Sequence, residues 1–211
     1  MTSPWRRTQV DPSFQTNEVS RDGRRTTSFR PNLTWKTAVP YDATCLQFAE
    51  SLHWYCNDFR TQQGRSPLEW NERLAVSAFN HCERMLAWQE FDHVLSDGVE
   101  LGERLTRSGY RWMYCRENIA LFRDVRMTSE QQILSIHIGW VRSPGHCDNL
   151  LADNVCEVGV CVRQTPDGVF CAVQNFGTPM TRAGAAVRHS RTVTRRVDSQ
   201  PAQSPRTIFE D

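Results

Sequence analysis

The stretch "CEVGVCVRQTPDGVFCAVQNF", residues 156–176, predicts two antiparallel strands joined by a tight turn. Its apolar residues recur with period two on both sides of "TPDG", which is the spacing of strands rather than of helices. Pro166 and Gly168 occupy positions that such a turn favours. Cys161 and Cys171 fall nearly opposite each other across the predicted hairpin, so they form a candidate cross-strand cysteine pair.

The sequence that precedes the hairpin carries helical spacing instead. Apolar residues recur at steps of three and four in segments that begin at Thr44, near Asn71, at Leu101 and at Ser129. Thr44 and Ser129 are the expected N-caps, and Gly109 is expected to end the third helix. Helices first and a hairpin last, without alternation of strand and helix, predict an α+β domain with helices packed on a small antiparallel sheet.

Charge divides the chain into an acidic body and two basic arms. Residues 1–40 carry seven basic and three acidic side chains, and residues 178–211 carry six basic and three acidic ones. The arms are therefore +4 and +3, and because the whole chain is +1, residues 41–177 are −6. Basic arms favour acidic partners, so we expect a protein assembly with an acidic surface, or nucleic acid, as the partner. The predicted arm contacts are Trp5, Arg6, Arg7, Arg24, Arg25, Arg30 and Trp35, with packing on the body as the alternative for Trp35.

The cysteines and the first residues bear on the compartment. All eight cysteines lie in the body, which fits disulfides, although buried, reduced thiols are the reading that we favour. Residues 1–32 contain no apolar core of a secretory signal, and no run reaches the roughly 18 apolar residues of a membrane span. We therefore expect no transmembrane segment and a cytoplasmic or cytoskeleton-associated location, with an organelle as the alternative.

Seven short motifs occur in order with short spacings. They are "RSPLEWNERLAVSAFNH", "FDHVLSDG", "GERLTRSGYRW", "ENIA", "GWVRSPGHCDNLL", "EVGVCV" and "AVQNFG". Together they resemble the CAP superfamily, the fold of cysteine-rich secretory proteins, antigen 5 and pathogenesis-related protein 1, in its bacterial SCP type. The resemblance covers about residues 45–177. It implies a three-layer α-β-α sandwich, with a CAP/SCP-like domain at 41–177 between extended N- and C-terminal arms at 1–40 and 178–211.

In that family, two histidines and two acidic residues line a shallow cleft. The matching motifs assign this cleft to His93, Glu117 and His146, while Ser143 stands where the second acid is expected. The resemblance implies that His93, Glu117 and His146 could hold Zn²⁺ or another divalent ion with one position open for water. The missing carboxylate weakens such a site, and Arg116 could pair with Glu117 and oppose a cation. A hydrogen-bond clamp between three segments is the favoured reading, with no cofactor.

Three functions follow from these observations. We expect a non-catalytic CAP-domain protein that serves as a structural or interaction subunit and docks through its arms on an acidic surface, such as a microtubule lattice or a ribonucleoprotein. One alternative is a module that binds a lipid, a sterol or a peptide in an apolar groove. The other is a metal-dependent hydrolase that uses His93, Glu117 and His146.

Overall fold

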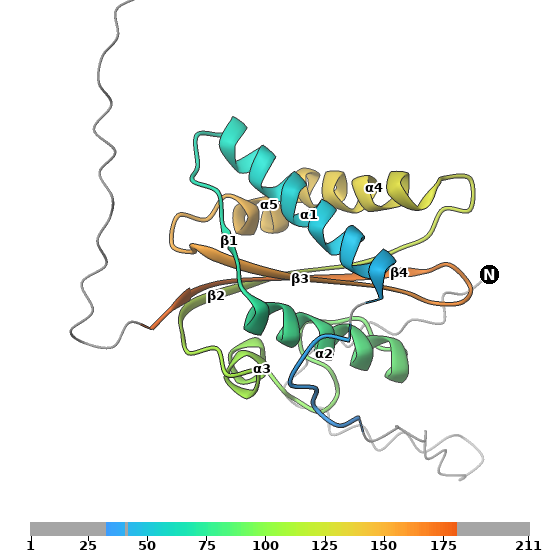
Figure 1. The fold of residues 1–211 in the computed structure, drawn as a ribbon, viewed down its shortest axis with the longest axis horizontal. Helices are drawn as coiled ribbons and strands as arrows, with labels where there is room; N and C mark the ends of the chain where they lie inside the picture. The colour runs from blue at the N-terminus through green and yellow to red at the C-terminus, as the bar shows by residue number, and fades with distance from the viewer. Residues whose placement is uncertain (1–32, 41, 181–211) are drawn as a thin grey trace, which may run out of the picture. The chain divides into compact units, whose positions relative to one another are not determined.

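The computed structural model describes residues 33–40 and 42–180. Helices cover both faces of a four-stranded sheet, so the predicted α+β class and its three-layer α-β-α arrangement are confirmed (Figure 1). The strands lie in the order β1-β3-β4-β2, where β1 is Glu69–Trp70, β2 is Trp112–Phe122, β3 is Glu157–Gln164 and β4 is Phe170–Pro179. The sheet is mixed rather than wholly antiparallel, because β1 pairs parallel to β3. With two residues, β1 is too short to show a period in the sequence.

The β3–β4 hairpin forms as predicted, with Gly168 in the left-handed region at φ +86°. Its register places Cys161 opposite Val173 and Cys171 opposite Arg163. The two cysteines therefore lie diagonally, displaced by two residues, and both are free thiols. This register corrects the expected cross-strand cysteine pair.

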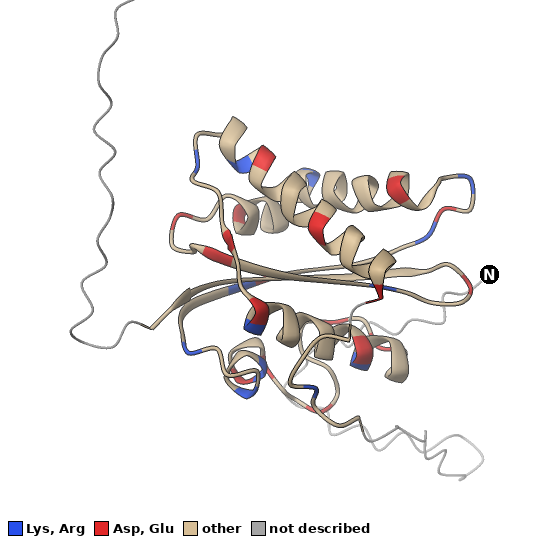
Figure 2. Cartoon of the chain, in the orientation of Figure 1, with Lys and Arg blue, Asp and Glu red and all other residues tan. Residues whose placement is uncertain are grey.

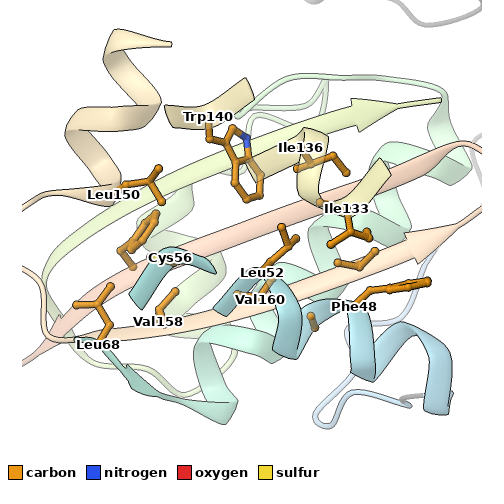
Figure 3. Close-up of a cluster of buried hydrophobic side chains, with 14 of the residues drawn as sticks. Phe48, Leu52, Cys56, Leu68, Ile133, Ile136, Trp140, Leu150, Val158 and Val160 are labelled. Atoms are coloured by element: carbon orange, nitrogen blue, oxygen red, sulfur yellow. The ribbon is translucent and has the colours of Figure 1, made fainter. Parts of the chain in front are cut away.

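Helices α1 (Ala43–Gln62), α4 (Ser129–Arg142) and α5 (Pro144–Leu150) cover one face of the sheet (Figure 1). Their apolar side chains, among them Leu52 and Ile136, pack onto Val160 of the sheet (Figure 3). Within residues 33–40 and 42–180, none of the helices combines the length and the apolar composition needed to cross a membrane.

The caps of α1 and α4 lie one or two residues before the positions that the sequence suggested. Asp42 caps α1, because its carboxylate accepts a hydrogen bond from the Cys45 backbone N–H at 2.8 Å. Thr128 caps α4 in a capping box with Gln131. The expected caps lie inside the first turns instead. Thr44 is two residues after the cap Asp42, and Ser129 is one residue after the cap Thr128.

Helices α2 (Glu72–Trp88) and α3 (Leu101–Arg107) cover the other face (Figure 1). α2 lies directly on β3 at Gly159, where an added Cβ would be 2.1 Å from the Ala75 backbone nitrogen. Such a contact cannot be relieved by a side-chain rotation, because the obstructing atoms belong to the backbone. Gly159 therefore sets the distance between α2 and the sheet.

Residues 33–40 are not a free part of the N-terminal arm. The Asn80 side-chain amide forms two hydrogen bonds with the backbone of Lys36. Its oxygen accepts from the Lys36 N–H at 2.8 Å, and its nitrogen donates to the Lys36 carbonyl at 3.1 Å. The Trp35 ring lies 4.0 Å from the Arg84 guanidinium and 5.0 Å from that of Arg107. Trp35, for which the sequence offered a partner contact or packing on the body as alternatives, thus packs on α2 and α3 of its own chain. The other predicted arm contacts, Trp5, Arg6, Arg7, Arg24, Arg25 and Arg30, lie outside the described residues.

We predict that Gly159→Ala lowers the free energy of unfolding by about 3 kcal/mol, because α2 must move away from the sheet. Gly139→Ala is the matched control, since a Cβ at Gly139 in α4 would meet no atom within 4 Å. The control is expected to be neutral or to stabilise the fold by up to about 1 kcal/mol. Urea unfolding of the two variants measures both values, and equal stability of the two would contradict the close approach of α2.

Candidate functional site

The four cleft residues come from three separate segments. His93 lies in the loop between α2 and α3, Glu117 lies on β2, and Ser143 and His146 lie where α4 ends and α5 begins. His93 Nδ1 is 2.8 Å from Glu117 Oε1, and His146 Nδ1 is 2.9 Å from Ser143 Oγ. Burial, followed by the proximity of His93, lowers the pKa of His146. The residues therefore form two neighbouring hydrogen-bonded pairs.

A buried ion pair fixes Glu117, the central residue of the site. Arg104 on α3 donates to Glu117 Oε2 at 2.6 Å, and the side chains of both residues are almost completely buried. The Asn175 amide, oriented so that its nitrogen donates to Glu117 Oε2 at 3.0 Å, also accepts from Ser77 Oγ and from the Ala78 backbone N–H. Both carboxylate oxygens of Glu117 are therefore engaged by protein donors.

The surroundings of Glu117 hold it in the ionised form. Burial raises the pKa of this carboxyl, but Arg104, His81 and His93 together outweigh burial and lower the pKa to about 2. Because an ionised carboxylate can only accept, His93 Nδ1 is the donor in the hydrogen bond to Glu117. Glu117 thus orients the His93 ring, whose side chain is half-exposed.

Arg104, and not Arg116, is the arginine that pairs with Glu117. Neighbouring residues on a strand point to opposite faces of the sheet, so Arg116 faces away from Glu117. It donates instead to the side-chain oxygens of Asn149 and Asn154, at 3.2 and 3.3 Å. This corrects the expected pairing of Arg116 with Glu117.

The sequence did contain a signal for Arg104. On a helix that begins at Leu101, Arg104 falls three residues after Leu101 and directly before Leu105, within the apolar stripe. A charged residue in such a stripe is buried only if it has a partner. Arg104 also donates to the carbonyls of His93 and Val99, at 2.6 and 3.2 Å, so it holds the His93 loop as well as Glu117.

A third histidine, His81 on α2, lies beneath the pair of His93 and Glu117. Its Nε2 donates to the Asp92 carbonyl at 3.0 Å and is 3.9 Å from Glu117 Oε1. Burial lowers the pKa of His81 to about 4, although the charge of Glu117 acts in the opposite direction. His81 is therefore neutral at neutral pH, and its contact with Glu117 is not an ion pair.

The other pair of the cleft is held against the outer edge of β2. The Gly177 carbonyl on β4 faces β3, because it accepts from the Cys156 backbone N–H. Gly177 pairs with Cys115 of β2, so the carbonyl of Cys115 points away from β4. Backbone carbonyls alternate in direction from one residue to the next, so those of Glu117 and Ile119 also point to the free edge of the sheet. The Glu117 carbonyl accepts a hydrogen bond from α5, and the Ile119 carbonyl accepts one from α4.

Asn149 of α5 donates to the Glu117 carbonyl at 3.0 Å and to Asn118 Oδ1 at 2.9 Å. Trp140 of α4 donates through its indole nitrogen to the Ile119 carbonyl at 3.1 Å. These bonds tie the α4–α5 junction to β2. They place the Ser143–His146 pair beside the outer edge of β2.

The arrangement does not assemble the metal site that the family resemblance left open. In the part of the chain that the structure describes, no group of three His, Cys, Asp or Glu side chains is placed to hold a metal ion. Arg104 neutralises the charge of Glu117, so a cation in the cleft would gain little from this carboxylate. The predicted ligands His93, Glu117 and His146 are brought near one another, but as members of two separate hydrogen-bonded pairs.

We predict that Arg104→Ala lowers the free energy of unfolding by about 3 to 5 kcal/mol, because it leaves the Glu117 carboxylate buried without its cation. Arg65→Ala is the control, since the ion pair of Arg65 with Asp153 is exposed and should contribute no more than about 0.5 kcal/mol. Chemical denaturation measures both. The double variant Arg104→Met with Glu117→Gln should recover part of the loss, and no recovery would contradict an ionic cause.

We also predict that His81 makes the fold sensitive to acid. Its pKa falls from 6.5 to about 4 on folding, so the unfolded chain binds the proton first as the pH drops. The stability that neutral His81 contributes is present above pH 6.5 and is lost as the pH falls through about 4, by an amount on the order of 3 kcal/mol. Glu117 causes a further loss of stability as the pH falls from 4.5, the ordinary pKa of its carboxyl, through about 2.

The test is the free energy of unfolding of the wild type and of His81→Gln as a function of pH. Glutamine keeps a nitrogen donor for the Asp92 carbonyl but does not titrate. The difference between the two curves should change between pH 7 and pH 4. Parallel curves over that interval would show that His81 does not carry the effect.

Comparison with known proteins identifies relatives of this domain. Residues 54–176 match the family model described as CAP, the cysteine-rich secretory protein family. Over 107 residues the chain is 32% identical to the uncharacterized membrane protein YlbC of Bacillus subtilis. That alignment covers 50% of this chain and only 29% of the bacterial protein.

Two solved structures share the fold. An outer surface protein of Borrelia burgdorferi has a TM-score of 0.58 at 17% identity, covering 68% of this chain and 99% of that one. An extracellular protein of Bacillus anthracis that contains an SCP domain has a TM-score of 0.55 at 24% identity, covering 66% of this chain and 45% of that one.

These relatives contradict the cytoplasmic or cytoskeleton-associated location that we expected from the sequence. Their names describe a membrane protein, an outer surface protein and an extracellular protein. The expectation rested on the absence of an apolar signal in residues 1–32, and an absence of that kind does not fix a compartment. The location expected from the sequence is therefore wrong.

Proposed function

The chain belongs to the CAP family, and we propose that it is a non-catalytic interaction module of this family that acts at a cell surface or outside the cell. The proposed location rests on the names of its relatives, which are membrane, outer surface and extracellular proteins. The proposed lack of catalysis rests on the state of Glu117. The proposed mode of interaction rests on the charge of the arms.

The observation that carries the non-catalytic role is the engagement of both Glu117 oxygens by protein donors. A general base needs a carboxylate that can take up a proton near neutral pH, whereas the pKa of Glu117 is lowered to about 2. As a metal ligand, Glu117 would have to compete with the donors already on its oxygens, His93 on Oε1 and Arg104 and Asn175 on Oε2. Glu117 therefore serves to hold α3, β2 and β4 together and to orient His93.

Charge supports docking on an acidic surface. Acidic and basic side chains are interspersed over the body (Figure 2), but residues 41–177 sum to −6 while the flanking arms are +4 and +3. A positive arm on a negative body is attracted to an acidic partner that the body alone would repel. The microtubule lattice and the ribonucleoprotein suggested by the sequence presuppose the cytoplasm, so we do not retain them as partners.

We predict that neutralising the N-terminal arm weakens binding to an acidic surface. In the full chain, Arg6, Arg7, Arg24, Arg25 and Arg30 are changed together to glutamine, and binding to anionic lipid vesicles is measured by sedimentation. Binding should fall by about tenfold or more, because each basic side chain near such a surface contributes about 1 kcal/mol.

The matched control changes five exposed arginines of the body to glutamine, which alters the net charge equally; they are Arg65, Arg73, Arg111, Arg123 and Arg126. If both sets weaken binding equally, the arms have no special role. Hydrolysis of an ester or peptide substrate that His93→Ala abolishes would contradict the non-catalytic part of the proposal. The alternative of a module that binds a lipid, a sterol or a peptide stays a prediction.

A further inference from the structure

Three cysteines gather between α2 and the sheet, on the face away from α1. Cys82 of α2, Cys161 of β3 and Cys171 of β4 are each no more than 1% exposed, within one apolar cluster. The register of the hairpin, which separates Cys161 from Cys171, turns both toward α2. The thiol that reaches the hairpin cysteines therefore comes from a helix and not from the neighbouring strand.

Cys82 and Cys171 bring two thiols of this cluster into contact. Cys171 Sγ lies 3.5 Å from Cys82 Sγ. Cys82 Sγ also lies 3.8 Å from the Cys161 backbone carbonyl. A disulfide requires the sulfurs to approach to about 2 Å, so the two side chains must move toward each other by roughly 1.5 Å.

We propose that Cys82 and Cys171 are a disulfide-forming pair that links α2 covalently to β4 when the chain folds in the presence of a disulfide oxidant. The two thiols give up two protons and two electrons and form one S–S bond. The oxidant, a small-molecule disulfide such as oxidised glutathione, takes up these protons and electrons, its own S–S bond breaks, and two thiols are released. Atoms and electrons balance without a metal or another cofactor.

The burial of the two thiols determines at which stage of folding the disulfide can form. Burial raises the pKa of the Cys82 thiol, and only a thiolate attacks a disulfide, so the folded core protects the reduced pair from exchange. Exchange therefore takes place before α2 closes on the sheet. The bond would close a loop in which the two cysteines are 89 positions apart, and long loops are those whose closure restricts the unfolded chain most.

The experiment refolds the full wild-type chain from the reduced, denatured state, once with reduced and oxidised glutathione and once with an excess of reductant. Each product is denatured in an alkylating reagent, and its peptides are mapped by mass spectrometry. The expected result under oxidising conditions is a linked pair of peptides that contain Cys82 and Cys171. The oxidised chain should also unfold at a higher urea concentration than the reduced chain.

Variants identify the atoms involved. Cys82→Ala and Cys171→Ala should abolish the linked peptides, whereas Cys161→Ala, an equally buried change on the same face, should leave them in place. The mapping of the wild type does not depend on whether a variant folds. Alkylation of all eight cysteines after oxidative refolding, or a link that joins other cysteines in place of this pair, would overturn the proposal.

Discussion

The ion pair between Arg104 and Glu117 is the contact on which the described domain depends most. It joins α3 to β2, and through Asn175 it reaches β4 and the first turns of α2. A buried ion pair of this kind adds little net stability relative to apolar residues in its place. Removing only one of its two partners, however, strongly destabilises the fold, because the other charge stays buried without a partner. It therefore requires that α3, the His93 loop and β2 adopt one arrangement together. The cleft has its geometry because this pair is intact.

The sequence predicted those parts of the fold that local spacing controls. The hairpin was evident from its period of two and its turn, and the helices from steps of three and four, with ends within a few residues. The strand β2 was missed, because Arg116, Glu117 and Asn118 interrupt any apolar alternation at its centre. Of these, Glu117 and Asn118 are buried because α3 and α5 supply partners for them.

The site was predicted as a set of residues but not as a set of contacts. The motifs located His93, Glu117 and His146, whereas the partner that the sequence offered for Glu117 was its neighbour Arg116. Arg116 is next to Glu117 in the sequence, but neighbouring residues on a strand face opposite sides of the sheet. The actual partner, Arg104, comes from helix α3. Trp35 and Cys82 follow the same rule, because each finds its partners on an element distant in sequence. Spacing identifies candidates, and only the packing of layers selects among them.

The edge strand explains why a cleft exists at this place. A strand at the end of a sheet exposes backbone groups that would otherwise pair with another chain. Here Asn149 and Trp140 donate to the outward carbonyls of β2, so helices α5 and α4 protect the edge. The same bonds bring the α4–α5 junction, with His146, to the outer edge of β2, where His93 lies near enough to lower the pKa of His146. The protection of the edge and the convergence of the two histidines are thus consequences of one set of hydrogen bonds.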